Sequence, residues 1–298
     1  DDTRQNVSKV LVTVMVTITD IRPSVKVDPV SFILSTKVDA DAALADAFAN
    51  NVTPTPSDVV SMQSDLNVME SVGNTIAGVE NGPGYFNQVR EARAAIATAT
   101  TNAQHAIDRT QQAITAPARF EATTLERINA LTEQFDRLRE SVADLTPPNQ
   151  KRQFQAFAGT LITTMAESST SGTYTTRNAV ADMISTITDN YDNFITDLDT
   201  LQTANAGDPD SYVPDAAPML LLNDIINFTV ANLNEIALEA QQERAVFIPE
   251  DATPIQLTHR FYGLDSEDIN LDRFVDTNNL SIFELVLIRK GRRVIYFV

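Results

Sequence analysis

The acidic residues of one loop are the side chains best suited to acid–base or cation chemistry. Asp208, Asp210 and Asp215 lie within residues 203–216, TANAGDPDSYVPDA. Carboxylates transfer protons when their pKa values are shifted, and they also bind Ca²⁺. However, these aspartates stand beside proline and glycine, and their spacing is not that of a calcium-binding loop. We interpret them as turn residues, with a cation site as the alternative.

The two histidines add no catalytic arrangement. His105 has Asp108 and Arg109 nearby on a predicted helix, and His259 precedes Tyr262 near the C-terminus. No nucleophile motif accompanies either histidine, so we interpret His105 as a solvated helix residue and His259 as a packing residue. Cysteine is absent, which excludes disulfides and thiolate metal sites. The sequence therefore predicts a protein that is not an enzyme and has no cofactor or metal.

A basic run near the C-terminus contrasts with the rest of the chain. Arg289, Lys290, Arg292 and Arg293 place four cations within five residues, whereas the formal net charge of the chain is -18. A solvated hairpin edge would explain the run, and so would a docking spot for an acidic neighbour such as another copy of this chain. A nucleic-acid contact is the third interpretation. The acidic composition argues against it, because phosphate affinity comes from clustered Lys and Arg.

The N-terminal residues 7–21, VSKVLVTVMVTITDI, carry the clearest strand pattern. Alternation places five β-branched residues on one face, namely Val10, Val12, Val14, Val16 and Ile18. A strand of this length is not stable alone, so we expect this face to pair with another subunit or with residues that precede Asp1. Because the chain begins with Asp1 rather than Met, we expect it to be a piece of something longer.

Long amphipathic helices are predicted for the middle of the chain. Apolar residues recur at intervals of three and four within residues 59–76, 125–145, 151–169, 177–201 and 219–243, and alanine-rich segments cover residues 38–50 and 86–114. Breakers such as Asn81-Gly82-Pro83-Gly84 separate the segments, which favours an antiparallel bundle. No apolar run reaches the roughly 18 residues of a membrane span, so none is predicted.

The C-terminal residues follow a different order. A short strand at 245–248 is stopped by Pro249, a helix predicted from Thr253 ends at Gly263, and a second helix is predicted for 266–278 before a strand at 293–298. We therefore predict an α+β chain of mainly long amphipathic helices. Its expected parts are an N-terminal β segment that ends a truncated domain (1–36), a helical domain (37–242) and a small βααβ domain (243–298).

The C-terminal part resembles a LysM-like module. The resemblance rests on TPIQLTHRFYG (253–263), DSEDINLDRFVDTNN (265–279) and GRRVIYFV (291–298). Family members commonly have an Arg-Tyr-Gly helix end, a helix that ends in Asn, and Gly before the last strand. Those places are held here by Arg260, Tyr262, Gly263, Asn278, Asn279 and Gly291. The resemblance implies a βααβ domain and, as an alternative function, a peptidoglycan-binding module of a cell-wall-associated protein.

The order of the whole chain, a β segment, helices and a LysM-like end, is similar to the DNA circularisation (or circulation) proteins of contractile-tailed phages. This resemblance implies a structural component of the tail baseplate that joins the tail tube to the wedges. Its partners would be other tail proteins and copies of itself, and its location would be the virion after assembly in the host cytoplasm. Phe261, Tyr262 and the basic run are the expected docking residues. The family's traditional name implies DNA circularisation as a second alternative.

Overall fold

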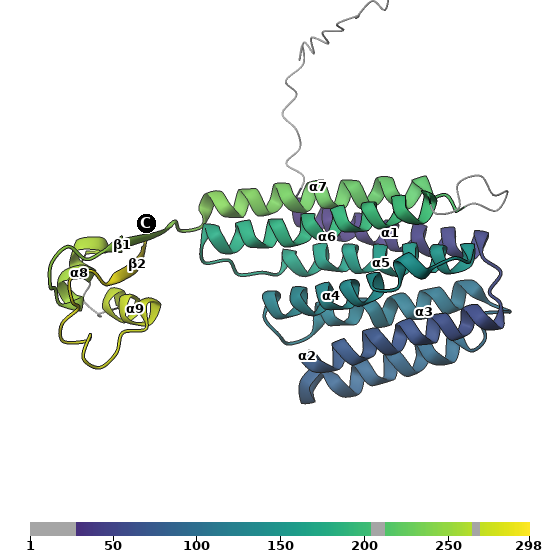
Figure 1. Ribbon diagram of the computed structural model, residues 1–298, viewed down its shortest axis with the longest axis horizontal. Helices are drawn as coiled ribbons and strands as arrows, with labels where there is room; N and C mark the ends of the chain where they lie inside the picture. Colours follow the sequence, from purple (N-terminus) through teal and green to yellow (C-terminus); the bar gives the residue numbers. More distant parts are fainter. Residues whose placement is uncertain (1–27, 204–211, 264–268) are drawn as a thin grey trace, which may run out of the picture.

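The computed structural model describes residues 28–203, 212–263 and 269–298. Within these ranges, seven long helices form a bundle, and two short helices and two strands form a smaller C-terminal unit (Figure 1). The bundle helices are α1 (Pro29–Asn51), α2 (Pro56–Ile96), α3 (Ala103–Thr115), α4 (Thr124–Arg139), α5 (Pro148–Thr170), α6 (Arg177–Thr203) and α7 (Ala216–Glu239), with 3₁₀ turns η1 (Ala116–Arg119) and η2 (Val142–Asp144). The C-terminal unit comprises β1 (Glu243–Phe247), α8 (Pro254–Phe261), α9 (Ile269–Asn278) and β2 (Arg293–Phe297).

The predicted fold class is wrong. The described residues are 74% helical, and their only sheet consists of two five-residue strands. The predicted α+β class is therefore not what the described residues show, although β1, α8, α9 and β2 follow the predicted order of strand, helix, helix and strand. Two strands of this length cannot form a layer that carries its own hydrophobic face, so the helices determine the class.

The predicted N-terminal strand lies outside the described residues. Val10, Val12, Val14, Val16 and Ile18 all precede residue 28, where the described chain begins. Their pairing with another strand stays a prediction, as does the division of the chain at residues 37 and 243. The end of the predicted β segment is helical instead, because α1 begins at Pro29 with the Asp28 carboxylate accepting from the amide of Val30 (3.3 Å).

The second helix is two helices joined at a kink. The sequence predicts a break at Asn81-Gly82-Pro83-Gly84, but the backbone turns at Gly78, where φ is +58°. Glycine tolerates this conformation because it has no Cβ. Pro83 lies inside the helix that follows the kink and does not end it. The chain therefore reverses direction three residues before the predicted breaker.

Helix α5 is the central element of the bundle. It packs against α1, α3, α4, α6 and α7, and Figure 1 shows it between the α6–α7 pair and helices α2, α3 and α4. It is buried nearly continuously from Gln153 to Ala166, which a helix can be only when neighbours surround it. Its predicted bounds of 151–169 are close to those observed, because Pro147-Pro148 marks the start.

Polar side chains of α5 hold the surrounding helices. Lys151 Nζ donates to the carbonyl of Leu201 in α6 (2.8 Å), and Gln153 Nε2 donates to Asp65 Oδ2 in α2 (2.6 Å). The Thr163 hydroxyl donates to Asp41 Oδ1 in α1 (2.6 Å). Because buried polar atoms are costly without partners, these bonds fix the register of each neighbour against α5.

Gly159 lets α1 approach α5, and replacing it provides a test of this packing. A Cβ at this position would lie 2.9 Å from Leu44 Cδ1, and the Leu44 side chain is itself buried. We expect Gly159→Val to lower the free energy of unfolding by about 1–3 kcal/mol through overpacking. Gly82→Ala is the matched control, because nothing lies within 4 Å of its Cβ position. Denaturant titration of both variants measures the difference, and equal stability would contradict the close packing.

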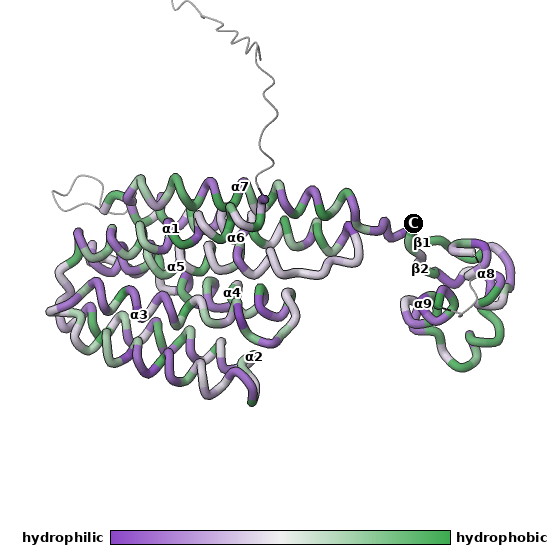
Figure 2. The backbone as a smooth tube through the Cα atoms, turned by 180° about the vertical axis from the view of Figure 1, so that it is seen from behind, coloured by the Kyte–Doolittle hydropathy of each residue, from purple (hydrophilic) through white to green (hydrophobic). Residues whose placement is uncertain are grey.

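One described helix, α7, is long and apolar enough by length and composition to cross a membrane. It packs against α1, α5 and α6, and 39% of its apolar window is buried. Its exposed positions include Asn223, Asp224, Asn227 and Glu235. The hydropathy colouring in Figure 2 shows this alternation of polar and apolar residues along α7. We interpret its apolar face as the surface that packs on the bundle.

Candidate docking surface

The C-terminal unit has a small hydrophobic core of its own. Ile248, Leu257, Phe274, Ile288 and Val294 are buried together, separate from the core of the bundle. The antiparallel pairing of β1 with β2 aligns Glu243 with Phe297 and Phe247 with Arg293. This core holds α8 and α9 against the sheet, and it positions the connection between α9 and β2.

Asn278 fastens the end of α9 to β2. Its side-chain oxygen accepts from the amide of Ile295 (2.6 Å), and its side-chain nitrogen donates to the Ile295 and Phe274 carbonyls (2.9 Å each). The side chain is buried, so all three bonds form away from water. The chain that leaves α9 at Asn279 therefore starts from a fixed point.

Residues 281–287 form an ordered turn, which we call the 281–287 turn. The Leu285 amide donates to the Ser281 carbonyl (3.0 Å), and the Leu287 amide donates to the Phe283 carbonyl (3.2 Å). Ser281 and Glu284 exchange side-chain to backbone bonds in the manner of a helix capping box. Arg292 Nε donates to Glu284 Oε1 (2.8 Å), which attaches the turn to the strand side of the unit.

The 281–287 turn presents apolar side chains to solvent. Ile282 is 81% exposed, Phe283 is 87% exposed and Val286 is 73% exposed. Figure 2 shows this stretch as the apolar loop at the outer edge of the C-terminal unit. Single exposed apolar residues are ordinary, but a group of them on an ordered turn marks an interaction site. From the sequence alone no ordered turn is predicted here, and we interpret the segment as a spacer. The Ser281-x-x-Glu284 capping pattern is the sequence signal that could have indicated the turn.

The two aromatic residues predicted for docking are used within the unit. The Phe261 ring stacks on Tyr296 with centroids 4.2 Å apart, and it also lies near Phe274. The Tyr262 hydroxyl accepts from the Phe297 amide (3.0 Å), and the Arg273 guanidinium lies over its ring. Their docking role stays a prediction, and these contacts give each of them a part in holding α8 and α9 against β2.

The basic run divides into two paired and two exposed cations. Arg289 bonds to Asp251 Oδ2 (2.9 Å) and Arg292 bonds to Glu284. The amide of Lys290 and then Arg289 lower the pKa of Asp251 below its usual range by hydrogen bonding to the carboxylate. The side chains of Lys290 and Arg293 are exposed and make no ion pair within the described residues. These two cations are therefore the ones left to meet a partner's charge.

The other residues singled out from the sequence are dispersed. Asp215 pairs with Arg152 of α5 (2.9 Å), whereas Asp208 and Asp210 lie outside the described residues. His105 lies on α3 and His259 is exposed in the last turn of α8. In the described part of the chain, no group of three or more His, Cys, Asp or Glu side chains is placed to hold a metal ion.

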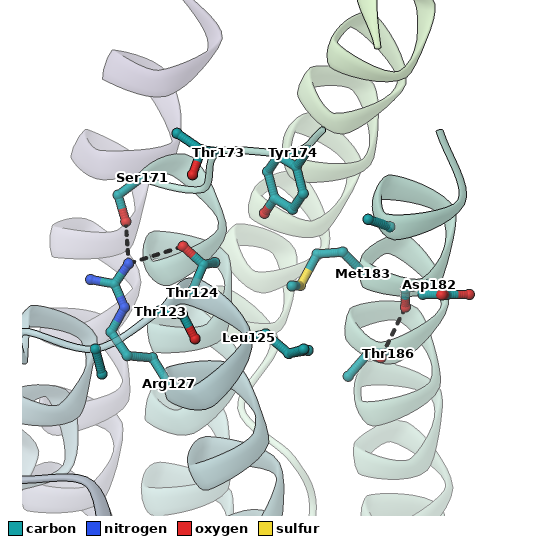
Figure 3. A pocket seen from close by; sticks show the side chains of 12 residues that line it. Thr123, Thr124, Leu125, Arg127, Ser171, Thr173, Tyr174, Asp182, Met183 and Thr186 are labelled. Atoms are coloured by element: carbon teal, nitrogen blue, oxygen red, sulfur yellow. Dashed lines mark hydrogen bonds between the residues drawn. The ribbon is translucent and has the colours of Figure 1, made fainter. Parts of the chain in front are cut away.

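A cavity of about 450 Å³ opens in the bundle between the start of α4, the α5–α6 connection and α6. Leu125 and Met183 point into the space between the two helices, and Tyr174 lies above them (Figure 3). Burial raises the pKa of Tyr174 to about 12, and its hydroxyl donates to the Ser169 carbonyl (3.0 Å). The cavity is thus mainly apolar where these three side chains meet.

Arg127 fixes the wall of this cavity. Its guanidinium donates to the carbonyl of Ala118 and to the hydroxyls of Thr124 and Ser171, at 2.8, 3.1 and 2.8 Å. The last two bonds are drawn in Figure 3. Because these bonds join the start of α4 to the end of α5, the cavity is preformed. Three side chains in its lining suit the binding of an apolar group, namely Leu125, Met183 and Tyr174.

Protein-family models and curated proteins give no match to the chain. Two features of the chain are suited to binding a partner, namely the exposed 281–287 turn and the preformed cavity between α4 and α6.

Proposed function

We propose that the chain is a non-enzymatic structural protein that acts by protein–protein assembly. The observation that carries this proposal is the ordered 281–287 turn, on which Ile282, Phe283 and Val286 are exposed to solvent. Exposed apolar groups that are already ordered lose little conformational entropy when a partner covers them. An aromatic anchor on a fixed turn is a common energetic centre of protein interfaces.

The setting that we propose is the baseplate of a contractile phage tail, as a connector between tail tube and wedges. The resemblance described for the sequence supports this setting. A long helical body with a small unit at the end of its last helix also suits a connector, because it presents contacts at separated places (Figure 1). The acidic composition argues against DNA circularisation, because the chain has 40 acidic residues against 22 Lys and Arg, and phosphate affinity comes from Lys and Arg.

Incorporation into tail particles tests the proposed function. We expect the wild-type chain to co-purify with tails, and we expect an Ile282→Ser/Phe283→Ser variant to be lost from them because its apolar contact is removed. Val79→Ser is the matched control, since Val79 is 93% exposed at the kink of α2 and lies outside the C-terminal unit. Immunoblotting of purified particles and electron microscopy provide the measurement.

Two results would overturn the proposal, and two others would support an alternative function. The chain could be absent from purified tails, or the double variant could be incorporated as well as the wild type. Specific sedimentation of the free chain with insoluble peptidoglycan would instead support the cell-wall alternative, and a salt-sensitive shift of duplex DNA in a gel would support DNA circularisation.

A further inference from the structure

The exposed turn and the bundle cavity have complementary chemistry. The 281–287 turn offers Phe283, 87% exposed, in a unit whose Lys290 and Arg293 side chains are exposed and unpaired within the described residues. The cavity offers Leu125, Met183 and Tyr174 as an apolar lining. Each surface is therefore apolar at its centre, and the unit that carries the turn also holds two exposed cations without an ion pair among the described residues, Lys290 and Arg293.

Two exposed carboxylates are available at the cavity, Asp182 in its lining and Glu126 beside it through a bond from Thr123. The cation of the lining, Arg127, is engaged in three hydrogen bonds. Asp182 lines the cavity and is exposed, and its carboxylate has no hydrogen bond or ion pair among the described residues. Glu126 is exposed in the first turn of α4 and accepts only from Thr123 through the capping box. Opposite charges around an apolar contact select the partner and its orientation.

The same chain does not fill its own cavity. Phe283 and Ile282 are exposed, and the turn belongs to a unit joined to the bundle through residues 240–242. At this junction the Arg177 amide donates to the Gln241 carbonyl (3.1 Å), and Arg177 Nε donates to the Ala240 carbonyl (3.1 Å). These bonds hold the start of the C-terminal unit beside α6.

We propose that the 281–287 turn of one chain inserts Phe283 into the α4–α6 cavity of a second copy, with Lys290 and Arg293 facing Asp182 and Glu126. The proposal rests on the proposed assembly function and names the partner at that surface. The two contacting surfaces differ, so the association is head-to-tail. Such contacts close into a ring when the rotation between copies permits, and otherwise they continue as a filament.

The preformed state of both surfaces supports this contact. The capping box of Ser281 and Glu284 orders the turn, and the three bonds of Arg127 order the cavity wall. The cavity volume of about 450 Å³ is large enough for an aromatic ring with its neighbouring methyl groups. One aromatic anchor gives weak pairwise binding, and repetition around a ring or along a filament would strengthen it through avidity.

Disulfide trapping tests the contact, because the natural chain contains no cysteine and gives no background. Ile282→Cys places a thiol next to the anchor and leaves Phe283 intact. Ala179→Cys places a thiol on the cavity lining at an exposed position. We expect a mixture of the two full-length variants, under mild oxidation, to yield a covalent heterodimer severalfold faster than a mixture of Val79→Cys with Ala179→Cys.

Three further variants make the result specific. Adding Phe283→Ser to the Ile282→Cys chain should reduce the trapping to the control rate. Asp182→Lys in the Ala179→Cys chain should also reduce it, and Lys290→Glu/Arg293→Glu in the other chain should restore it. Thermal unfolding of each variant confirms that the fold is retained, so a loss of trapping reports the contact.

Several outcomes would overturn the second-copy proposal. Equal trapping with the Val79→Cys control would show random collision, and preferential Ile282→Cys homodimers would show a turn-to-turn contact. If the disulfide forms only when Ile282→Cys and Ala179→Cys are in the same chain, the turn binds the cavity of its own chain. If trapping fails while incorporation into tails still depends on Phe283, the assembly function stands and its partner is a different protein.

Discussion

Replacing Phe157 by alanine is expected to lower the free energy of unfolding by about 3–5 kcal/mol, because the substitution removes a large ring from a closely packed core. Phe157 is fully buried in the middle of α5 and belongs to the main core cluster of the bundle. Since α5 contacts most of the other helices, a cavity there weakens several interfaces together. Denaturant titration followed by far-UV circular dichroism measures the change.

Phe283→Ala is the matched control for this prediction. The chemical change is the same, but the ring is 87% exposed, so the free energy of unfolding should change by less than about 0.5 kcal/mol. The two variants should also differ in their effect on assembly, because Phe283→Ala should weaken assembly while the chain stays folded. A small effect of Phe157→Ala would mean that neighbouring side chains collapse into the space, and that α5 is less central than its contacts indicate.

The bundle was the most predictable part of the chain. The period of Phe154, Phe157, Leu161 and Met165 indicates a helix over 151–169, and the observed α5 extends it by three residues at one end and one at the other. The helix was predictable because apolar residues spaced three and four apart form one face of a helix, and the fold buries that face. The spacing does not determine which helices pack against one another.

Local strand patterns misled the fold class. The two C-terminal strands are five residues long each, which is too short to set the class of a chain whose described residues are mostly helical. The kink of α2 was misplaced because Gly78 and Gly82 are both able to adopt unusual backbone angles, and the tertiary structure uses Gly78. Sequence spacing does not distinguish which of two such glycines a fold will use.

The docking surface was only partly predictable. Phe261 and Tyr262 were expected to dock as part of the LysM-like end, and in the fold both are half-buried through contacts with Tyr296 and the Phe297 amide. Ile282 and Phe283 belong to a segment interpreted from the sequence as a spacer, and only the fold shows that the 281–287 turn is ordered and faces solvent. Burial is a property of the assembled chain, and composition alone does not determine it.

Asp65→Asn is expected to stabilise the protein at neutral pH by about 1–2 kcal/mol and to leave its stability unchanged in acid. Burial beside α5 raises the pKa of Asp65 from 3.8 to about 6, and the hydrogen bond from Gln153 only partly offsets that rise. The folded protein therefore holds this proton more tightly than the unfolded chain between these two values. Asparagine keeps an acceptor for Gln153 without a charge to bury.

The pH dependence follows from the direction of this pKa shift. Below pH 3.8 the carboxyl is protonated in both the folded and the unfolded state, so the wild-type protein and the Asp65→Asn variant should have similar stability. As pH rises from 3.8 to about 6, the unfolded chain loses its proton first and the wild-type protein loses stability. Above about 6 the folded carboxyl is also ionised, and the difference between the two proteins becomes constant.

The difference between the two unfolding curves isolates Asp65 from other buried carboxyls. Burial also raises the pKa of Asp41, with Lys37 opposing the rise, and this residue contributes equally to both proteins. Denaturant titrations from acid to neutral pH provide the measurement. A variant that is less stable than the wild type at neutral pH would mean that the Gln153 bond to the ionised carboxylate outweighs the cost of burying its charge, and that α2 is held to α5 by a charge-assisted bond.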